Sequence, residues 1–131
     1  MITTPMNLYT AILAIWILIL ALRVIALRGN PIFAVLSFGR RTETRLDRAI
    51  RGHGNLIEYA PIFLILLWVA QSHGTPELRL HAYGIAFCLG RFLHGTLFCF
   101  LTTPSVPMRV GGMTLTLTPI LLLAIEVLRP I

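Results

Sequence analysis

Four apolar runs, each about as long as a helix that crosses a bilayer, constrain this chain more than any other feature. About 20 consecutive apolar residues are needed to cross the hydrocarbon core. The runs predict helices over residues 6–27, 45–70, 77–101 and 108–128, the second of which opens with polar residues. The sequence therefore predicts an all-α integral membrane protein, in which residues 1–131 form one domain built as a bundle of four transmembrane helices.

The composition excludes a water-soluble globule. The chain has 131 residues, of which 56% are hydrophobic and only 12% are charged, and its mean hydropathy is +0.83. A soluble domain of this length cannot hide so much apolar surface from water. No room is left for a second, soluble module beside the four helices.

The charges are distributed unevenly along the chain. All eleven basic residues are arginines, against five acids, which gives a net charge of +6. Most crowd the connection after the first run and the start of the second: Arg28, Arg40, Arg41, Arg45, Arg48 and Arg51. The positive-inside rule makes this loop cytoplasmic and both termini external, as in a bacterial inner membrane. The arginines form neither a solvated tail nor a repeated stripe, so no nucleic-acid partner is expected.

The two cysteines do not indicate a disulfide or a metal site. Cys88 and Cys99 lie in the same apolar run, so a bond between them would require a break in the predicted helix. The sequence contains no C-x-x-C and no H-E-x-x-H motif, so no structural metal is expected.

Polar residues recur along one stripe of the second predicted helix. They follow one another in steps of three or four residues: Arg45, Arg48, Arg51, Asn55 and Glu58. A charged side chain at membrane depth costs about 2.5–3.5 kcal/mol, so such groups turn inward, form pairs or line a polar cavity. We expect Glu58 to pair with Arg51 or with an arginine of a neighbouring helix.

Three further polar residues lie on the third and fourth predicted helices. Arg91 and His94 are one turn apart in the middle of an apolar run, where Arg91 is expected either to pair with Glu58 or to contact a ligand. His94 is open to two interpretations, a general base or a hydrogen-bonded packing residue. Arg109 begins the last helix, where it could form an anion site with free helix N–H groups or anchor the cytoplasmic end.

Near the opposite end of the last helix, Glu126 and Arg129 are three residues apart, which favours an ion pair on one helix face. The other arginines converge near the cytoplasmic face and would suit a small ligand that carries carboxylates. If the ligand also carried a thiol, an adjacent arginine would favour its ionised form.

The run DRAIRGHGNLIEYAP, from Asp47 to Pro61, resembles the second-helix signature of the MAPEG family, the membrane-associated proteins in eicosanoid and glutathione metabolism. That signature reads [E/D]-R-x-x-R-x-x-x-N-x-x-E-x-x-P. Arg91 and His94 are similar to the family's R-x-x-H in the third helix, and Arg109 follows a turn that contains prolines.

The resemblance implies a homotrimer that holds glutathione between neighbouring subunits near the cytosolic face. It implies that Arg109 is the catalytic residue, which stabilises the thiolate, and that Arg91 and His94 are structural or auxiliary. It also implies a set of glutathione-binding residues: Arg28, Arg48, Arg51, Asn55, Glu58 and Tyr59.

The leading prediction is a membrane glutathione transferase, open also to peroxidase chemistry, that uses glutathione as co-substrate and takes a hydrophobic electrophile from the surrounding lipid. The alternative is a non-catalytic membrane protein that binds a lipid or a small anionic ligand, its polar stripe serving helix packing. A transporter or channel would be expected to carry charges near the midplane of several helices.

Overall fold

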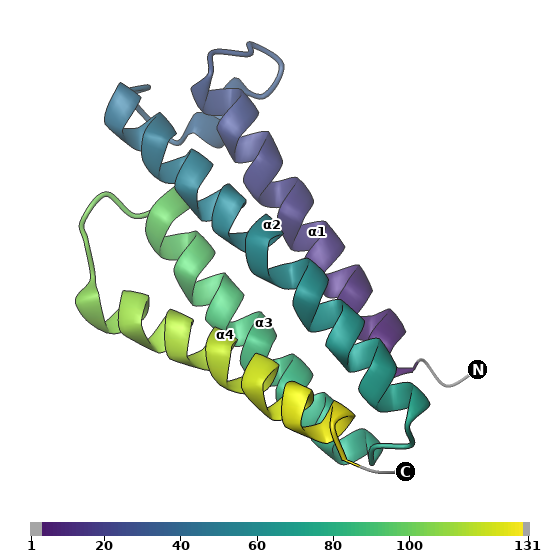
Figure 1. The fold of residues 1–131 in the computed structure, drawn as a ribbon. Coiled ribbons are helices and arrows are strands. Elements are labelled where there is room, and N and C mark those ends of the chain that lie inside the picture. The colour runs from purple at the N-terminus through teal and green to yellow at the C-terminus, as the bar shows by residue number, and fades with distance from the viewer. Residues whose placement is uncertain (1–3, 130–131) are drawn as a thin grey trace.

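A computed structural model describes residues 4–129, whose regular secondary structure consists of helices alone (Figure 1). The elements, in chain order, are α1 (Pro5–Leu27), a short 3-10 helix η1 (Ala34–Ser37), α2 (Glu43–Ser72), α3 (Glu77–Cys99) and α4 (Val106–Val127). All four α-helices are long and apolar enough to cross a membrane. The predicted all-α bundle of four membrane-spanning helices is confirmed.

Capping residues set the helix ends, and they lengthen two helices beyond the expected ranges. The Thr42 side chain accepts the Arg45 N–H, so α2 begins at Glu43, and the Ser105 side chain accepts the Met108 N–H, so α4 begins at Val106. The third helix ends two residues early, because the N–H groups of Phe100 and Leu101 both donate to the Thr96 carbonyl.

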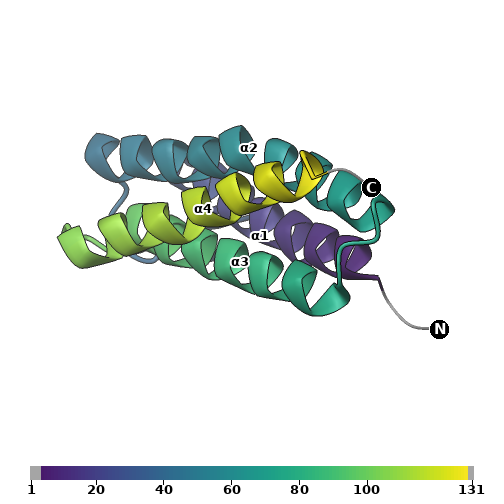
Figure 2. The same ribbon diagram turned by 60° about the horizontal axis from the view of Figure 1, so that its bottom comes forward.

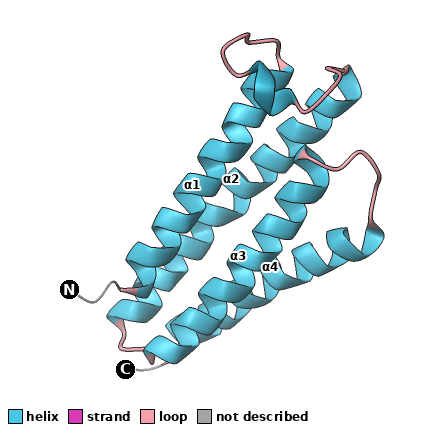
Figure 3. Ribbon diagram, turned by 180° about the vertical axis from the view of Figure 1, so that it is seen from behind, coloured by secondary structure: helices cyan, strands magenta, loops and turns pink. Residues whose placement is uncertain are grey.

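The helices run alternately up and down (Figures 1 and 3). One end of the bundle carries the α1–α2 and α3–α4 connections and is called the arginine-rich end, since residues 28–51 and Arg109 lie there. The other end carries the α2–α3 connection and both ends of the described chain, and is called the terminal end.

Contacts between helices arrange the bundle around α2 and α3 (Figure 2). The α3–α4 interface is the most extensive, and within residues 4–129 α1 and α4 do not touch. Gly90 allows the close approach of α3 to α4, because a Cβ there would lie 2.8 Å from the Gly112 carbonyl oxygen. At the α2–α3 interface the Phe63 and Phe87 rings stack with centroids 3.9 Å apart.

Apolar side chains fill the interior and also cover much of the outside. Outward-facing examples, each more than half exposed, occur on all four helices: Ile15, Leu18, Ile65, Trp68, Ile85 and Leu121. In water such a surface would drive association, whereas in a bilayer it meets lipid tails. The exterior therefore fits a helix bundle embedded in a membrane.

One buried cation organises the arginine-rich end. Arg23, near the end of α1, is 1% exposed, and its Nε donates to the Cys99 carbonyl at 2.9 Å while Nη1 donates to the Leu36 carbonyl. Its guanidinium lies over the Phe38 and Phe100 rings, 5.4 and 5.5 Å from their centroids. Arg23 thus joins α1, the η1 segment and the end of α3. The sequence analysis did not single it out.

Candidate functional site

The site is built around Arg48, which reaches from the first turns of α2 to the end of α3. Its Nη2 donates to the Leu97 carbonyl at 2.8 Å, an acceptor that the last turn of α3 leaves free, and to the Leu101 carbonyl at 3.3 Å, just beyond the helix. Its guanidinium lies 5.6 Å from the centroid of the Phe98 ring. Its Nε is buried and has no hydrogen-bond partner among the described residues. Arg48 is therefore fixed in place with donor capacity to spare.

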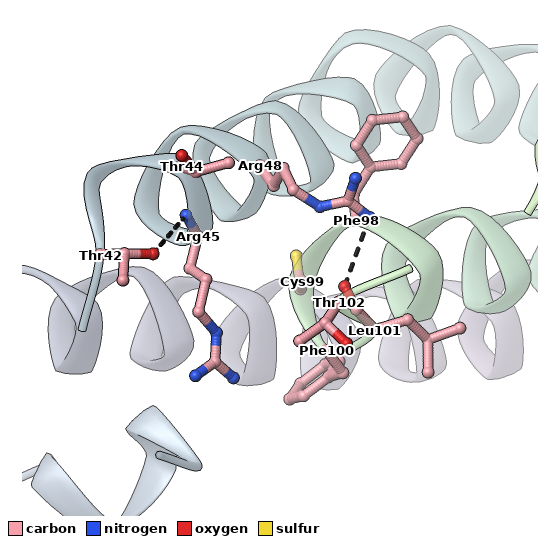
Figure 4. A pocket seen from close by; sticks show the side chains of 9 residues that line it. All are labelled: Thr42, Thr44, Arg45, Arg48, Phe98, Cys99, Phe100, Leu101 and Thr102. Atoms are coloured by element: carbon pink, nitrogen blue, oxygen red, sulfur yellow. Dashed lines mark hydrogen bonds between the residues drawn. The ribbon is translucent and has the colours of Figure 1, made fainter. Parts of the chain in front are cut away.

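A cavity of about 140 Å³ opens on one side of Arg48 (Figure 4). Residues from the start of α2 and the end of α3 line it: Thr42, Thr44, Arg45, Arg48, Phe98, Cys99, Phe100, Leu101 and Thr102. The Arg45 guanidinium donates to the carbonyls of Arg40 at 2.8 Å and Phe38 at 3.0 Å. Arg45 therefore holds the arginine-rich loop against α2.

A second cavity, also of about 140 Å³, brings Arg48 and Arg109 together. Its lining comes from all three helices that meet there: Arg48, Leu97, Phe98, Pro104, Ser105, Val106 and Arg109. The first turn of α4 forms one wall, and the N–H groups of a helix start carry partial positive charge. Two arginines and the first turn of a helix therefore line one small space, a combination that suits an anion.

Arg91 lies deeper in the bundle and links three helices. Its Nε donates to Thr116 Oγ1 at 2.8 Å, and its terminal nitrogens lie 3.5 Å from the carbonyl oxygens of Asn55 and Gly112. It also lies over the Tyr59 ring, 5.3 Å from the centroid. Neutral oxygens and an aromatic face thus take the place of an anionic partner.

Of the two alternatives expected for Arg91, the ion pair with Glu58 is wrong. Neither this pair nor one between Glu58 and Arg51 is among the salt bridges of residues 4–129, and both Arg51 and Glu58 are exposed on the outer face of α2. Arg51 and Glu58 are seven residues apart, about 10.5 Å along the helix axis. Arg91 points between α2, α3 and α4, where hydroxyl and carbonyl oxygens already accept its protons.

The remaining site candidates are dispersed. His94 is buried and stacks on the Phe98 ring with centroids 4.6 Å apart, and its Nδ1 has no partner in the described chain. Arg28 caps the end of α1 and is exposed. The structure thus brings Arg48 to Arg109 and Asn55 and Tyr59 to Arg91, but leaves Arg28, Arg51 and Glu58 outside these contacts.

The terminal end carries a separate charged cluster. Glu126 is buried and pairs with Arg129 at 3.1 Å, as the spacing predicted, and also with Arg79 of α3 at 3.1 Å. The Tyr83 hydroxyl donates to the same carboxylate at 3.0 Å. The sequence did not reveal the roles of Arg79 and Tyr83, because they depend on how α3 packs against α4.

No metal centre is found in the part of the chain that the structure describes, where no three or more His, Cys, Asp or Glu side chains gather closely enough to hold an ion. Cys88 and Cys99 are free and buried. The arrangement can hold anions by guanidinium groups and helix N–H groups, and a thiolate is one such anion.

The family model of the MAPEG family matches residues 6–129, which is nearly the whole chain. The chain belongs to the MAPEG family. It is thereby a membrane protein of the family involved in glutathione and eicosanoid metabolism.

Two curated relatives, both called "Inner membrane protein YecN", come from Escherichia coli K12 and from E. coli O6:H1 strain CFT073. Each is 34% identical to this MAPEG chain over 59 residues. The matched segment covers 45% of this chain and 45% of each relative, so it spans about half of their length. No solved structure matches the chain.

Proposed function

We propose that this MAPEG protein is a membrane glutathione transferase that ionises the thiol of glutathione and adds the thiolate to a hydrophobic electrophile. This proposal rests on the observation that Arg48 and Arg109 line one cavity beside the first turn of α4. The same thiolate could attack a hydroperoxide, which would add peroxidase activity.

The proposed mechanism is electrostatic activation of the thiol. A thiolate, and not a thiol, is the effective nucleophile, and a nearby cation favours the ionised form. Arg109 is exposed at the mouth of the cavity, whereas Arg48 is held by the end of α3. In this arrangement Arg109 faces the sulfur and Arg48 supplies a fixed positive charge behind it. The two carboxylates of glutathione would bind other arginines at the same end of the bundle.

We also propose that the active form is a homotrimer. The outer face of α2 carries Arg51 and Glu58 in line with exposed apolar residues such as Ile57 and Ile65. Exposing charged side chains to lipid at membrane depth costs free energy, so we expect an adjacent copy of the chain to pack over this face. Such a neighbour would bring Arg51, Asn55 and Glu58 into a site shared between subunits.

The proposed location is the inner membrane of a bacterium, with the arginine-rich end in the cytoplasm and both termini outside. The curated relatives are named inner membrane proteins. The loop and first turns of α2 gather most of the arginines, and the terminal end carries only Arg79 and Arg129. Cytosolic glutathione would then reach the Arg48 and Arg109 cavity directly from water.

The test is ultraviolet thiolate absorbance while glutathione is titrated, near neutral pH, into the detergent-purified protein. We expect a saturable signal that Arg109→Ala abolishes. Arg40→Ala is the matched control, because Arg40 is an exposed arginine of the same end that lines neither cavity. The control should keep the full signal.

The alternative function, a non-catalytic protein that binds a lipid or small anion, gives a different outcome. It predicts no thiolate signal from a folded wild-type oligomer, and Arg109→Ala would then change only surface interactions, typically within about 0.5 kcal/mol of stability. A thiolate signal that survives in Arg109→Ala would also contradict the proposed role of Arg109.

A further inference from the structure

An apolar hollow lies between α3 and α4, away from the arginine-rich end. It has a volume of about 360 Å³ and is called the α3–α4 groove. Two alanines and a tyrosine of α3 and apolar or hydroxyl side chains of α4 line it: Ala82, Tyr83, Ala86, Thr114, Leu115, Thr118, Pro119 and Leu122. None of these residues is charged.

The groove occupies the half of the bundle nearest the terminal end. Ala86 is nine residues from the start of α3, and Thr114 is thirteen residues from the end of α4. At 1.5 Å per residue these distances are about 14 and 20 Å, so the inner end of the groove lies near the middle of a bilayer. The lining itself extends about 6 Å along α3, from Ala82 to Ala86, and about 12 Å along α4, from Thr114 to Leu122, so it is long enough for part of an acyl chain.

Helix periodicity places two arginines at the outer end of the groove. Arg79, Tyr83 and Ala86 follow one another at steps of four and three on α3. Leu122, Glu126 and Arg129 do the same on α4. Tyr83 joins the two features directly, because its ring lines the groove while its hydroxyl donates to Glu126.

The cluster at this end has one positive charge in excess. The buried Glu126 carboxylate bonds to Arg79 and to Arg129, both at 3.1 Å. The two arginine side chains remain 51% and 57% exposed, so each keeps free donors on the solvent side. A guanidinium with spare donors recognises phosphate oxygens well.

We propose that the α3–α4 groove binds one acyl chain of an anionic glycerophospholipid whose phosphate rests on Arg79 and Arg129. An apolar groove lies next to two arginines that share one carboxylate, so an acyl chain in the groove and a phosphate on the arginines would both find complementary surfaces. This site is separate from the Arg48 and Arg109 cavity, so it does not depend on the proposed transferase activity. Its role would be to anchor α4 against α3.

The test is native mass spectrometry of the detergent-purified protein titrated with phosphatidylglycerol or with phosphatidylcholine of the same chain length. We expect wild type to retain phosphatidylglycerol preferentially, by roughly fivefold per engaged arginine. The triple substitution Arg79→Gln, Glu126→Gln and Arg129→Gln keeps hydrogen-bonding side chains and removes the charge, so the preference should fall to about one.

Two single substitutions test the same binding site if the triple variant unfolds. Glu126→Gln alone raises the charge of the cluster from +1 to +2, counting Arg79 and Arg129 against Glu126, and should strengthen phosphatidylglycerol retention. Ala86→Phe fills the groove and should reduce retention of both lipids. Arg40→Gln with Arg41→Gln is the matched control, with two exposed arginines neutralised at the opposite end.

Three results would overturn the inference. Equal retention of the two lipids by wild type would show that the arginines do not distinguish between the two headgroups. Unchanged retention in Ala86→Phe would show that no chain lies in the groove. Loss of the oligomer in Ala86→Phe, seen by light scattering, would show that a second copy of the chain occupies the groove instead of a lipid.

Discussion

Arg91 in the middle of α3 donates its Nε proton to Thr116 Oγ1 of α4 at 2.8 Å, and both side chains are shielded from water. The Thr116 hydroxyl donates in turn to the Gly112 carbonyl at 2.7 Å. A buried cation is thus solvated by a hydroxyl, carbonyls and the Tyr59 ring. Such a cation depends on each neutral acceptor, since no carboxylate within residues 4–129 forms a salt bridge with it.

We therefore predict that Thr116→Val destabilises the protein by about 1–3 kcal/mol. The substitution keeps the shape of the side chain but leaves the buried Arg91 Nε without its acceptor. The free energy of unfolding can be measured by titrating the detergent-solubilised protein with sodium dodecyl sulfate. Thr114→Val is the control, because Thr114 is exposed on the same helix and makes no side-chain hydrogen bond in the described structure. Equal stability of the two variants would contradict the prediction.

The contact between α3 and α4 gives a second prediction. Gly90→Ala would place a Cβ 2.8 Å from the Gly112 carbonyl oxygen and 2.9 Å from Thr116 Oγ1, so the two helices must separate. Overpacking of this kind costs about 1–3 kcal/mol. Gly111→Ala is the matched control, since a Cβ there meets no atom within 4 Å. In thermal unfolding followed by circular dichroism, Gly90→Ala should have a lower midpoint temperature than wild type, and Gly111→Ala should not.

The sequence predicted the helices well because apolar run length and the arginine-rich loop are local features. It predicted the Glu126–Arg129 pair within one helix, but not which polar groups of different helices meet. Arg91 and Glu58 carry opposite charges on adjacent helices, yet the rotation of α2 turns Glu58 outward and leaves Arg91 facing Thr116. Arg48 and Arg109 are 61 residues apart in sequence, and only the packing of α2, α3 and α4 brings both to one cavity.

Arg23 shows the same limit of sequence reasoning and supplies a third prediction. Arg23→Met removes the donors to the Leu36 and Cys99 carbonyls, so the η1 segment should detach from the end of α3. We expect trypsin to cut after the exposed Arg40 and Arg41 at least about tenfold faster, because losing even one hydrogen bond to a charged group costs roughly 1.5–3 kcal/mol and about 1.4 kcal/mol is a factor of ten.

Arg28→Met is the control for this experiment, since Arg28 ends the same helix with its side chain exposed. Mass spectrometry of the early fragments identifies the cleaved bonds. Equal cleavage after Arg40 and Arg41 in both variants would mean that Arg23 does not hold the loop.

The exposed face of α2 gives the last prediction, which bears on the proposed trimer. Ile57 is 46% exposed beside Glu58, and a trimer in which this face of α2 surrounds the three-fold axis would bring the Ile57 side chains of neighbouring copies close together. Ile57→Cys should therefore be joined between subunits by a flexible bis-maleimide, giving a dimer band on a denaturing gel.

The native Cys88 and Cys99 are buried and should contribute little background to this cross-linking. Leu18→Cys is the control, because Leu18 is 62% exposed on α1, where lipid is the expected neighbour. If both variants cross-linked equally, or Ile57→Cys failed to cross-link, this face of α2 would not surround the three-fold axis of the trimer.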